Sequence, residues 1–113
     1  MATYKADELI GYCVCSVSGR AAHLISIAVQ SNYRRKGVAT SLLDRLVEHL
    51  KDMSVEEMWL EVSVNNQEAV ALYSKRSFEK QTNLPNYYSD GSNAFRMSLV
   101  LSKGTSKPAR NPK

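Results

Sequence analysis

Apolar and polar residues follow two different periods along the chain, and each period predicts a different kind of element. Residues 8–19 and 21–30 are rich in β-branched and aromatic or apolar residues, and a Ser-Gly pair near residue 19 predicts a turn between two strands. The second of these stretches is nearly all apolar, which is typical of a strand buried on both faces in the middle of a sheet. Apolar residues then recur at helical spacing and predict a helix over about 36–52. Its apolar stripe consists of Val38, Leu42, Leu43, Leu46, Val47 and Leu50.

The second half of the chain repeats this change of period. Residues 56–64 alternate between apolar and polar positions and predict a strand, and residues 66–77 predict a second helix. Residues 78–101 predict a strand, a loop that turns at Pro85 and Asp90-Gly91, and a last strand. The predicted order is therefore strand, strand, helix, strand, helix, strand, strand. A strand–helix–strand unit implies a parallel pair with a crossover helix, and the last two strands predict an antiparallel hairpin.

Length and charge divide the chain into one small domain and a tail. The chain has 113 residues, 43% of them hydrophobic, which is enough for a core within residues 1–101. The net charge is +4, and the last twelve residues supply this whole excess through Lys103, Lys107, Arg110 and Lys113. Residues 102–113 contain no core-forming side chain and are predicted to be a disordered basic tail. Such a tail either keeps the domain in solution or contacts an anionic surface such as ribosomal RNA.

Composition also argues against several classes of protein. The apolar stretches are far shorter than the roughly 20 residues of a membrane span, and the start of the chain has no secretory pattern, so we expect no membrane partner. Cys13 and Cys15 are too few for a disulfide scaffold or a four-ligand zinc site. We therefore expect a cytoplasmic protein without a metal.

The stretch "YRRKGVAT" (33–40) raises the question of a bound ligand, because three cations precede a glycine at the start of a predicted helix. The first backbone N–H groups of a helix lack helical partners, and phosphate groups bind there. Gly37 lets a ligand approach the backbone closely, and Ala39 keeps the next position small. The loop matches neither a Walker motif nor a dinucleotide-binding fingerprint. Taken by itself, it fits a solvated basic turn as well as a phosphate site.

Three motifs in order along the chain resemble a known family. Arg34-x-x-Gly37-x-Ala39 matches the Gln/Arg-x-x-Gly-x-Gly/Ala signature of the GNAT acetyltransferases, and "SIAVQSNYRRKGVATSLL" is similar to their strand–loop–helix core. "WLEVSVNNQEAVALYSKRSF" is similar to the second half of that fold. "NYYSDGSNAFRMSL" resembles the closing hairpin of the N-terminal (Nα) protein acetyltransferases of archaeal type and of eukaryotic catalytic subunits. The resemblance covers about residues 8–101 and implies an α/β (α+β) fold: a mixed sheet with a central parallel pair and crossover helix and a closing antiparallel hairpin.

The resemblance implies that acetyl-CoA is the cosubstrate. In the family arrangement the backbone of residues 35–40 holds the pyrophosphate between the side chains of Arg34 and Arg35. The strand edge at residues 27–29 binds the pantetheine arm, and one of its backbone N–H groups stabilises the oxyanion of the tetrahedral intermediate. The implied cofactor-binding residues are Ile27, Ala28, Val29, Arg34, Arg35, Lys36, Gly37, Val38, Ala39, Thr40, Asn66 and Tyr73.

The resemblance also implies roles for residues outside the phosphate loop. Glu61 and His23 match positions used as general base, sharing the task through water, and Tyr73 matches a tyrosine that protonates the departing thiolate. Tyr87 and Tyr88 match paired tyrosines that bind the backbone of the substrate peptide. The residues alone favour a surface glutamate at position 61 and a structural histidine at position 23, and they leave Tyr73 open as a core-facing tyrosine; only the resemblance implies the catalytic roles.

The family domain begins with a strand and two helices that have no counterpart here, since Met1 falls within the family's second strand. We therefore expect a partial domain whose uncovered surface is met by an auxiliary subunit or by self-association. The function implied is acetyl transfer from acetyl-CoA to the α-amino group of protein N-termini. Alternatives are acetylation of lysine or of a small amine, and a catalytically weak acetyl-CoA-binding or interaction module.

Overall fold

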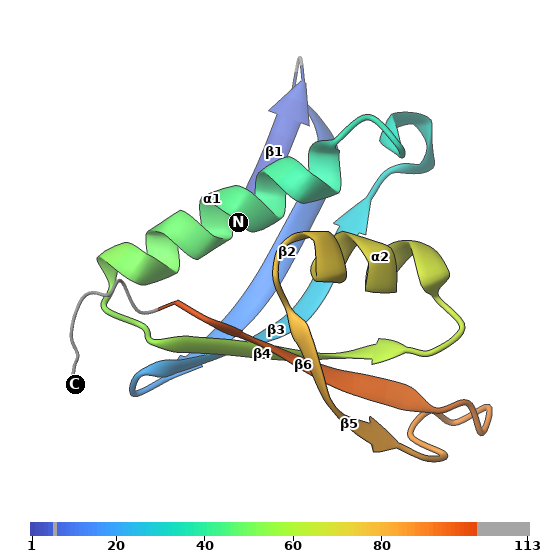
Figure 1. Cartoon of the computed structure of the whole chain (residues 1–113). Coiled ribbons are helices and arrows are strands. Elements are labelled where there is room, and N and C mark those ends of the chain that lie inside the picture. The colour runs from blue at the N-terminus through green and yellow to red at the C-terminus, as the bar shows by residue number, and fades with distance from the viewer. Residues whose placement is uncertain (6, 102–113) are drawn as a thin grey trace.

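A computed structural model describes residues 1–5 and 7–101 (Figure 1). The basic tail predicted for residues 102–113 lies outside the described residues. The elements are β1 (Ala2–Lys5), β2 (Glu8–Ser18), β3 (Ala21–Val29), the 3-10 turn η1 (Ser31–Tyr33), α1 (Val38–Asp52), β4 (Glu57–Ser63), α2 (Gln67–Lys75), β5 (Glu79–Leu84) and β6 (Ala94–Val100). The seven elements predicted from the sequence are all present, while the short β1 and η1 were not indicated by the hydrophobic pattern.

The strands form one mixed sheet in the order β1-β2-β3-β4-β6-β5. β3 and β4 are parallel, with α1 in the connection between them, and β5 and β6 form an antiparallel pair. The predicted mixed sheet, central parallel pair and closing hairpin are therefore confirmed. Neither helix in the described part of the chain has the length and apolar content needed to cross a bilayer.

The parallel strands β3 and β4 are paired through their backbones over a short stretch, and then they diverge. In the described structure the register joins Ala21 to Glu57, Ala22 to Met58 and His23 to Trp59, and it does not extend past His23. Beyond this point β3 stays paired with β2 as far as Val29, and β4 stays paired with β6 as far as Ser63. A register shift between Val14 and Cys15 of β2 leaves one extra residue in β3 at Ile25, and such a bulge increases the local twist. Figure 1 shows the result: β2 and β3 run steeply across the direction of β4 and β6.

Both helices lie on the same face of the sheet, where they bury one apolar core. The predicted stripe of α1 is confirmed, because Leu42, Leu43, Leu46 and Leu50 are all buried. Alternate residues of β4 join them in the core: Met58, Leu60 and Val62.

The other face of the sheet is open, which corrects the prediction that residues 21–30 are buried on both faces. Ala22 and Leu24 are buried against the helices, but Ile25 is 54% exposed. Tyr12 and Val14 of β2 are exposed as well. The near-continuous apolar run was misleading because both crossover helices cover the same side.

Gly11 tests how closely β2 approaches α1. A Cβ added at this position would stand 3.0 Å from the backbone oxygen of Ala28 and 3.1 Å from Cδ1 of Leu42. We expect Gly11→Ala to lower the free energy of unfolding by about 1–3 kcal/mol, because overpacking displaces backbone here. Urea unfolding measures the change, with Ser16→Ala at an exposed position of β2 as the control. A Gly11→Ala variant as stable as the parent would mean that β2 and α1 have room between them.

Candidate functional site

A cleft of about 410 Å³ lies on the helix-bearing side, between the loop that precedes α1 and the helix α2. It is lined by Ile27, Ala28, Val29, Tyr33, Arg34, Arg35, Gly37, Val38, Ala39, Thr40, Asn66, Glu68, Ala69, Leu72 and Tyr73. The cleft thus brings together the cofactor residues predicted from the sequence, with the exception of Lys36. Tyr33, Glu68, Ala69 and Leu72 also line it, and these positions were not predicted.

The loop at the mouth of the cleft has an unusual backbone. Arg35 and Gly37 both adopt left-handed conformations, with φ of 62° and 79°. A non-glycine residue in this region costs of order 1–3 kcal/mol and often marks a functional site. Gly37 is the N-cap of α1, so the N–H groups of the next residues begin the helix beside the cleft. This geometry offers an anion both backbone donors and the positive end of a helix.

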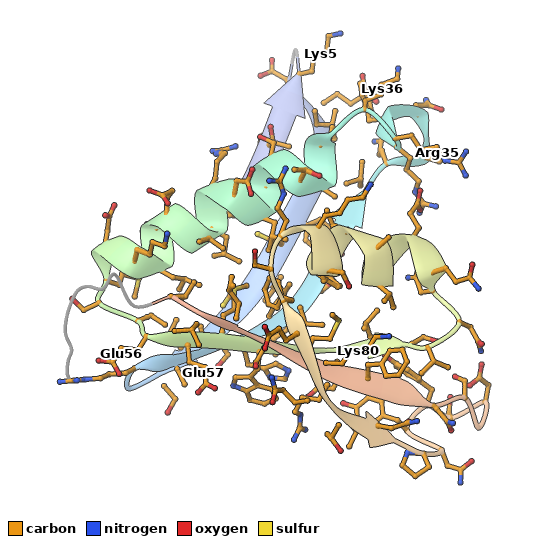
Figure 2. All side chains as sticks on the ribbon, viewed as in Figure 1. Lys5, Arg35, Lys36, Glu56, Glu57 and Lys80 are labelled. Carbon is orange, nitrogen blue, oxygen red and sulfur yellow. The ribbon has the colours of Figure 1, made fainter. Side chains whose placement is uncertain are left out.

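The three cationic side chains of the loop, Arg34, Arg35 and Lys36, have different contacts. Arg34 donates a hydrogen bond from Nε to the carbonyl of Val29 at 3.3 Å, which ties the loop to the end of β3. Arg35 reaches across to α2, where its Nε lies 3.5 Å from a carboxylate oxygen of Glu68; both side chains are largely exposed. Lys36 borders a separate cavity of about 170 Å³ and lies over the ring of Tyr33. Figure 2 shows Arg35 and Lys36 around the loop that leads into α1.

The far wall of the cleft is provided by α2. Asn66 caps this helix by accepting a hydrogen bond from the N–H of Ala69 at 3.1 Å, which fixes where the helix starts. Tyr73, one turn from the end of α2, is buried and packs edge-on against Phe78. Burial, with a smaller contribution from neighbouring Tyr88, raises the pKa of Tyr73 to about 12. Its hydroxyl is therefore a proton donor, not a phenolate, throughout the neutral range.

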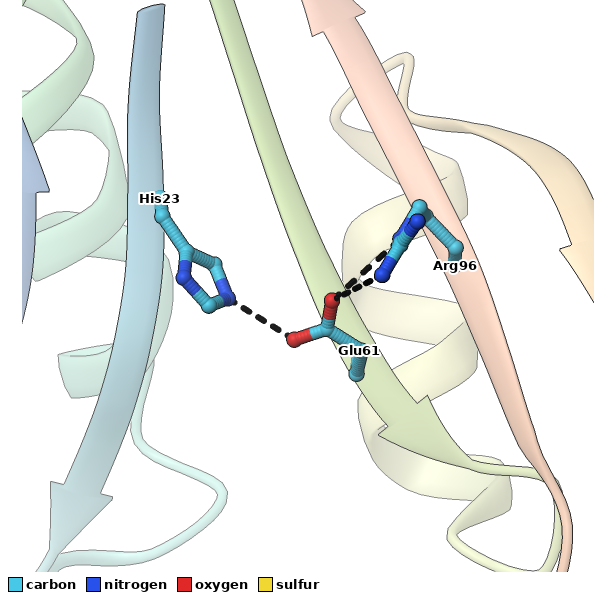
Figure 3. Close-up of polar contacts among 3 residues, drawn as sticks. All are labelled: His23, Glu61 and Arg96. Carbon is cyan, nitrogen blue, oxygen red and sulfur yellow. Dashed lines mark hydrogen bonds and ion pairs between the residues drawn. The ribbon is translucent and has the colours of Figure 1, made fainter. Parts of the chain in front are cut away.

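A polar network occupies the opposite face of the sheet and joins three adjacent strands (Figure 3). Nε2 of His23 on β3 lies 2.7 Å from Oε1 of Glu61 on β4. Oε2 of the same carboxylate accepts hydrogen bonds from Nη2 and Nε of Arg96 on β6, at 3.1 and 3.3 Å. The side chain of Glu61 is only 8% exposed. The two predicted base residues are thus in direct contact, without the intervening water that the sequence analysis assumed.

The direct contact fixes the tautomer of the imidazole. An ionised carboxylate can only accept hydrogen bonds, so Nε2 of His23 carries the proton that is shared with Glu61. In the neutral ring, Nδ1 is then the basic nitrogen. A carboxylate that orients an imidazole in this way is the arrangement used by histidine bases in enzymes.

Arg96 and Trp59 complete this network, and neither was assigned a role from the sequence. Trp59 stacks on His23 with ring centroids 3.7 Å apart and planes 4° from parallel, and the guanidinium carbon of Arg96 lies 5.1 Å from the Trp59 ring. Arg96 does stand out in "AFRMSLV" as a charged residue in an otherwise uncharged strand. Its partner could not be identified without the register, which places Arg96 directly opposite Glu61.

The loop between β5 and β6 carries the two tyrosines that were predicted to bind a peptide. Tyr87 and Tyr88 pack edge to face in this loop, with ring centroids 5.0 Å apart. Burial, then the neighbouring Tyr87 and Glu61, raise the pKa of Tyr88.

The arrangement suits a transfer reaction between two ligands that approach from opposite faces of the sheet. One face has a basic loop at a helix start and a buried phenol, and the other has a histidine–carboxylate pair. β3 carries residues of both, with His23 in the polar network and Ile27, Ala28 and Val29 in the lining of the cleft. In residues 1–5 and 7–101, no three His, Cys, Asp or Glu side chains are grouped as a metal ion would require.

Comparison with known proteins agrees with this geometry. A family model described as "Acetyltransferase (GNAT) family" matches residues 1–78. An N-alpha-acetyltransferase of Saccharolobus solfataricus is 48% identical over 83 residues, which make up 73% of this chain and 50% of that protein. The chain therefore spans about half the length of this curated relative.

Solved structures share the fold. The crystal structure of the ribosomal-protein-S18-alanine N-acetyltransferase from Escherichia coli superposes with a TM-score of 0.85 at 31% identity, covering 97% of this chain and 70% of that one. The NatC complex bound to Gag peptide and CoA contains a chain that superposes with a TM-score of 0.83 at 26% identity, covering 88% of this chain and 66% of that one.

The raised pKa of Tyr73 predicts how stability depends on alkaline pH. The phenol titrates near 10 in the unfolded chain and near 12 in the folded one, so its contribution is complete below pH 10 and is lost as the pH rises through 12. We expect the free energy of unfolding to fall less between pH 10 and pH 12 in Tyr73→Phe than in the parent, because phenylalanine has no proton to lose. Urea unfolding at a series of pH values measures this difference. Tyr12→Phe, at an exposed position of β2, is the control. Identical pH dependence in the parent and Tyr73→Phe would contradict the buried, protonated state.

Proposed function

The chain belongs to the acetyltransferase (GNAT) family, and from this membership we propose that it transfers an acetyl group from acetyl-CoA to the α-amino group of a protein or peptide. The observation that supports the proposal is that β3 contributes both to a cleft and to a polar pair on the other face of the sheet. A cleft suited to a phosphate-bearing ligand lies on one face, and the His23–Glu61 pair lies on the other.

In this proposal the cleft holds acetyl-CoA. The backbone at residues 35–40, with Arg34 and Arg35, binds the pyrophosphate, and Glu68 gives up its contact with Arg35 when the more highly charged ligand arrives. Asn66 and the edge of β3 from Ile27 to Val29 line the path of the pantetheine arm. Lys36 lines a neighbouring cavity, so it contributes to binding of acetyl-CoA only through long-range electrostatic attraction.

The proposed reaction proceeds by direct attack of the amine on the thioester carbonyl. A free α-amino group has a pKa of about 7.7–8.0, so part of it is already neutral near pH 7. Nδ1 of His23 accepts the proton that the nitrogen loses as it forms the new C–N bond, and Glu61 stabilises the resulting imidazolium. A backbone N–H of β3 stabilises the oxyanion as the C–S bond breaks, and the Tyr73 hydroxyl donates a proton to the departing thiolate.

The relatives favour a protein N-terminus as the acceptor. The relative at 48% identity is named an N-alpha-acetyltransferase, and the Escherichia coli neighbour acts on an alanine of ribosomal protein S18. We assign Tyr87 and Tyr88, which pack edge to face in the β5–β6 loop, to binding the backbone of an extended peptide. An auxiliary subunit that covers the open face of the sheet, where Tyr12, Val14 and Ile25 are exposed, fits this function. Two free thiols, Cys13 and Cys15, fit a reducing, cytoplasmic setting.

Replacement of Gly37 tests the cofactor site. A Cβ at Gly37 meets no atom of the described residues within 4 Å, so a larger side chain there would occupy space beside the cleft and not clash with the core. We expect Gly37→Val to raise the Kd for acetyl-CoA, measured by calorimetry, by roughly tenfold or more, which is about 1.4 kcal/mol. Gly19→Val is the matched control, because Gly19 has the same left-handed backbone and open surroundings in the β2–β3 turn. Equal Kd values in Gly37→Val and the parent would assign the phosphate cradle to the wrong loop.

The direct contact of His23 with Glu61 predicts that their variants are not additive. We expect His23→Ala to lower kcat on a short peptide by roughly 10²–10⁴-fold and Glu61→Gln to lower it less. The double variant should be no slower than His23→Ala, because Glu61 acts through the imidazole. The KM for acetyl-CoA should stay nearly constant in all three variants.

The same assay separates the alternatives. If the fold-loss of kcat in the double variant equals the product of the two single losses, His23 and Glu61 act independently. Transfer to a peptide with a blocked N-terminus and a free lysine would favour a lysine acetyltransferase. Acetyl-CoA binding without any turnover in the parent would favour a non-catalytic binding module.

A further inference from the structure

Four side chains on the open face of the sheet form a closed cluster around the proposed base. His23 contacts both Trp59 and Glu61, and Arg96 contacts the same two residues from the other side. The four come from three neighbouring strands, and the sheet register places them: His23 lies opposite Trp59, and Glu61 lies opposite Arg96. The cluster is therefore held by backbone pairing, which fixes geometry more firmly than a loop would.

Arg96 determines which oxygen of Glu61 faces the imidazole. Its Nε and Nη2 both donate to Oε2, at 3.3 and 3.1 Å, so this oxygen is engaged and Oε1 is directed to His23. The planar guanidinium can make such a paired contact, whereas a lysine ammonium provides a charge without the fixed fork. The carboxylate is 8% exposed and Arg96 is 42% exposed, so the arginine balances a nearly buried negative charge.

Trp59 determines the plane of the imidazole. His23 and Trp59 form the last pair before β3 and β4 diverge, and their rings are within 4° of parallel. Stacking over 3.7 Å prevents the imidazole from rotating away from Glu61. The indole face also attracts a cation, which favours the imidazolium that forms when His23 accepts a proton.

We infer that Arg96 and Trp59 are positioning residues for the His23–Glu61 pair, Arg96 by fixing the carboxylate and the local charge, and Trp59 by fixing the imidazole plane. The inference rests on the proposed function, because it assigns His23 the role of proton acceptor. Neither residue lines the cleft assigned to acetyl-CoA. Their loss should therefore affect kcat and not the KM for acetyl-CoA.

Arg96 variants separate charge from geometry. Arg96→Met should lower kcat about tenfold or more, because a misplaced base is a poor proton acceptor. Arg96→Lys keeps the positive charge but should recover only part of kcat, because an ammonium lacks the planar fork that fixes the carboxylate. Arg20→Met is the matched control, because Arg20 makes an exposed ion pair with Glu56.

Trp59 variants and NMR supply a readout that needs no turnover. The stacked indole should shift the ring-proton resonances of His23 upfield, and Trp59→Leu should remove this shift, while Trp59→Phe retains part of it. His49, exposed on α1, is the internal reference. The ring-proton resonances of His23 should also move in Arg96→Met, because the carboxylate that orients the ring loses its partner, and they should stay constant in Arg20→Met.

Two results would overturn the inference. The first is parent-like kcat in both Arg96→Met and Trp59→Leu. The second is a His23 ring-proton resonance that neither substitution moves. A parent chain that binds acetyl-CoA without turnover would instead remove the proposed function, and the NMR spectra alone would then decide whether the cluster positions His23.

Discussion

The divergence of β3 and β4 is the constraint on which the rest of the structure depends. Backbone pairing stops at His23 and Trp59, two positions before the extra residue of the bulge, and each strand then follows its other neighbour. After the divergence β3 follows β2 and β4 follows β6. β3 therefore carries residues of both the polar network and the cleft, His23 before the bulge and Ile27 to Val29 after it.

The two halves are built by different means. On the helix side, a loop with left-handed residues at Arg35 and Gly37 turns the chain so that α1 starts beside the cleft. A loop and a helix end can adjust to a flexible, charged ligand. On the other face, the cluster around Glu61 is fixed by the register of three strands. Rigid strands suit a proton acceptor, whose efficiency depends on position to within a fraction of an ångström.

A nearly buried carboxylate explains why the network has several members. Glu61 loses most of its contact with water, and an unpaired buried charge is strongly destabilising. His23 and Arg96 each satisfy one carboxylate oxygen, and Trp59 packs against both partners. The four residues therefore stabilise one another, and a change at any one of them reaches the imidazole.

The sequence by itself determined the elements, the parallel pair, the closing hairpin and the family, because period, turn residues and the Arg34-x-x-Gly37-x-Ala39 motif are local properties of the chain. Through resemblance to family positions it also predicted a phosphate loop and base roles for Glu61 and His23, and these roles stay predictions. It did not show that these side chains touch, that Arg96 completes the network, that Lys36 leaves the cleft, or that one face of β3 is open. Those features depend on strand register, on the bulge at Ile25 and on both helices covering one face. Each of these brings together residues far apart in the sequence, so only the tertiary structure could decide them.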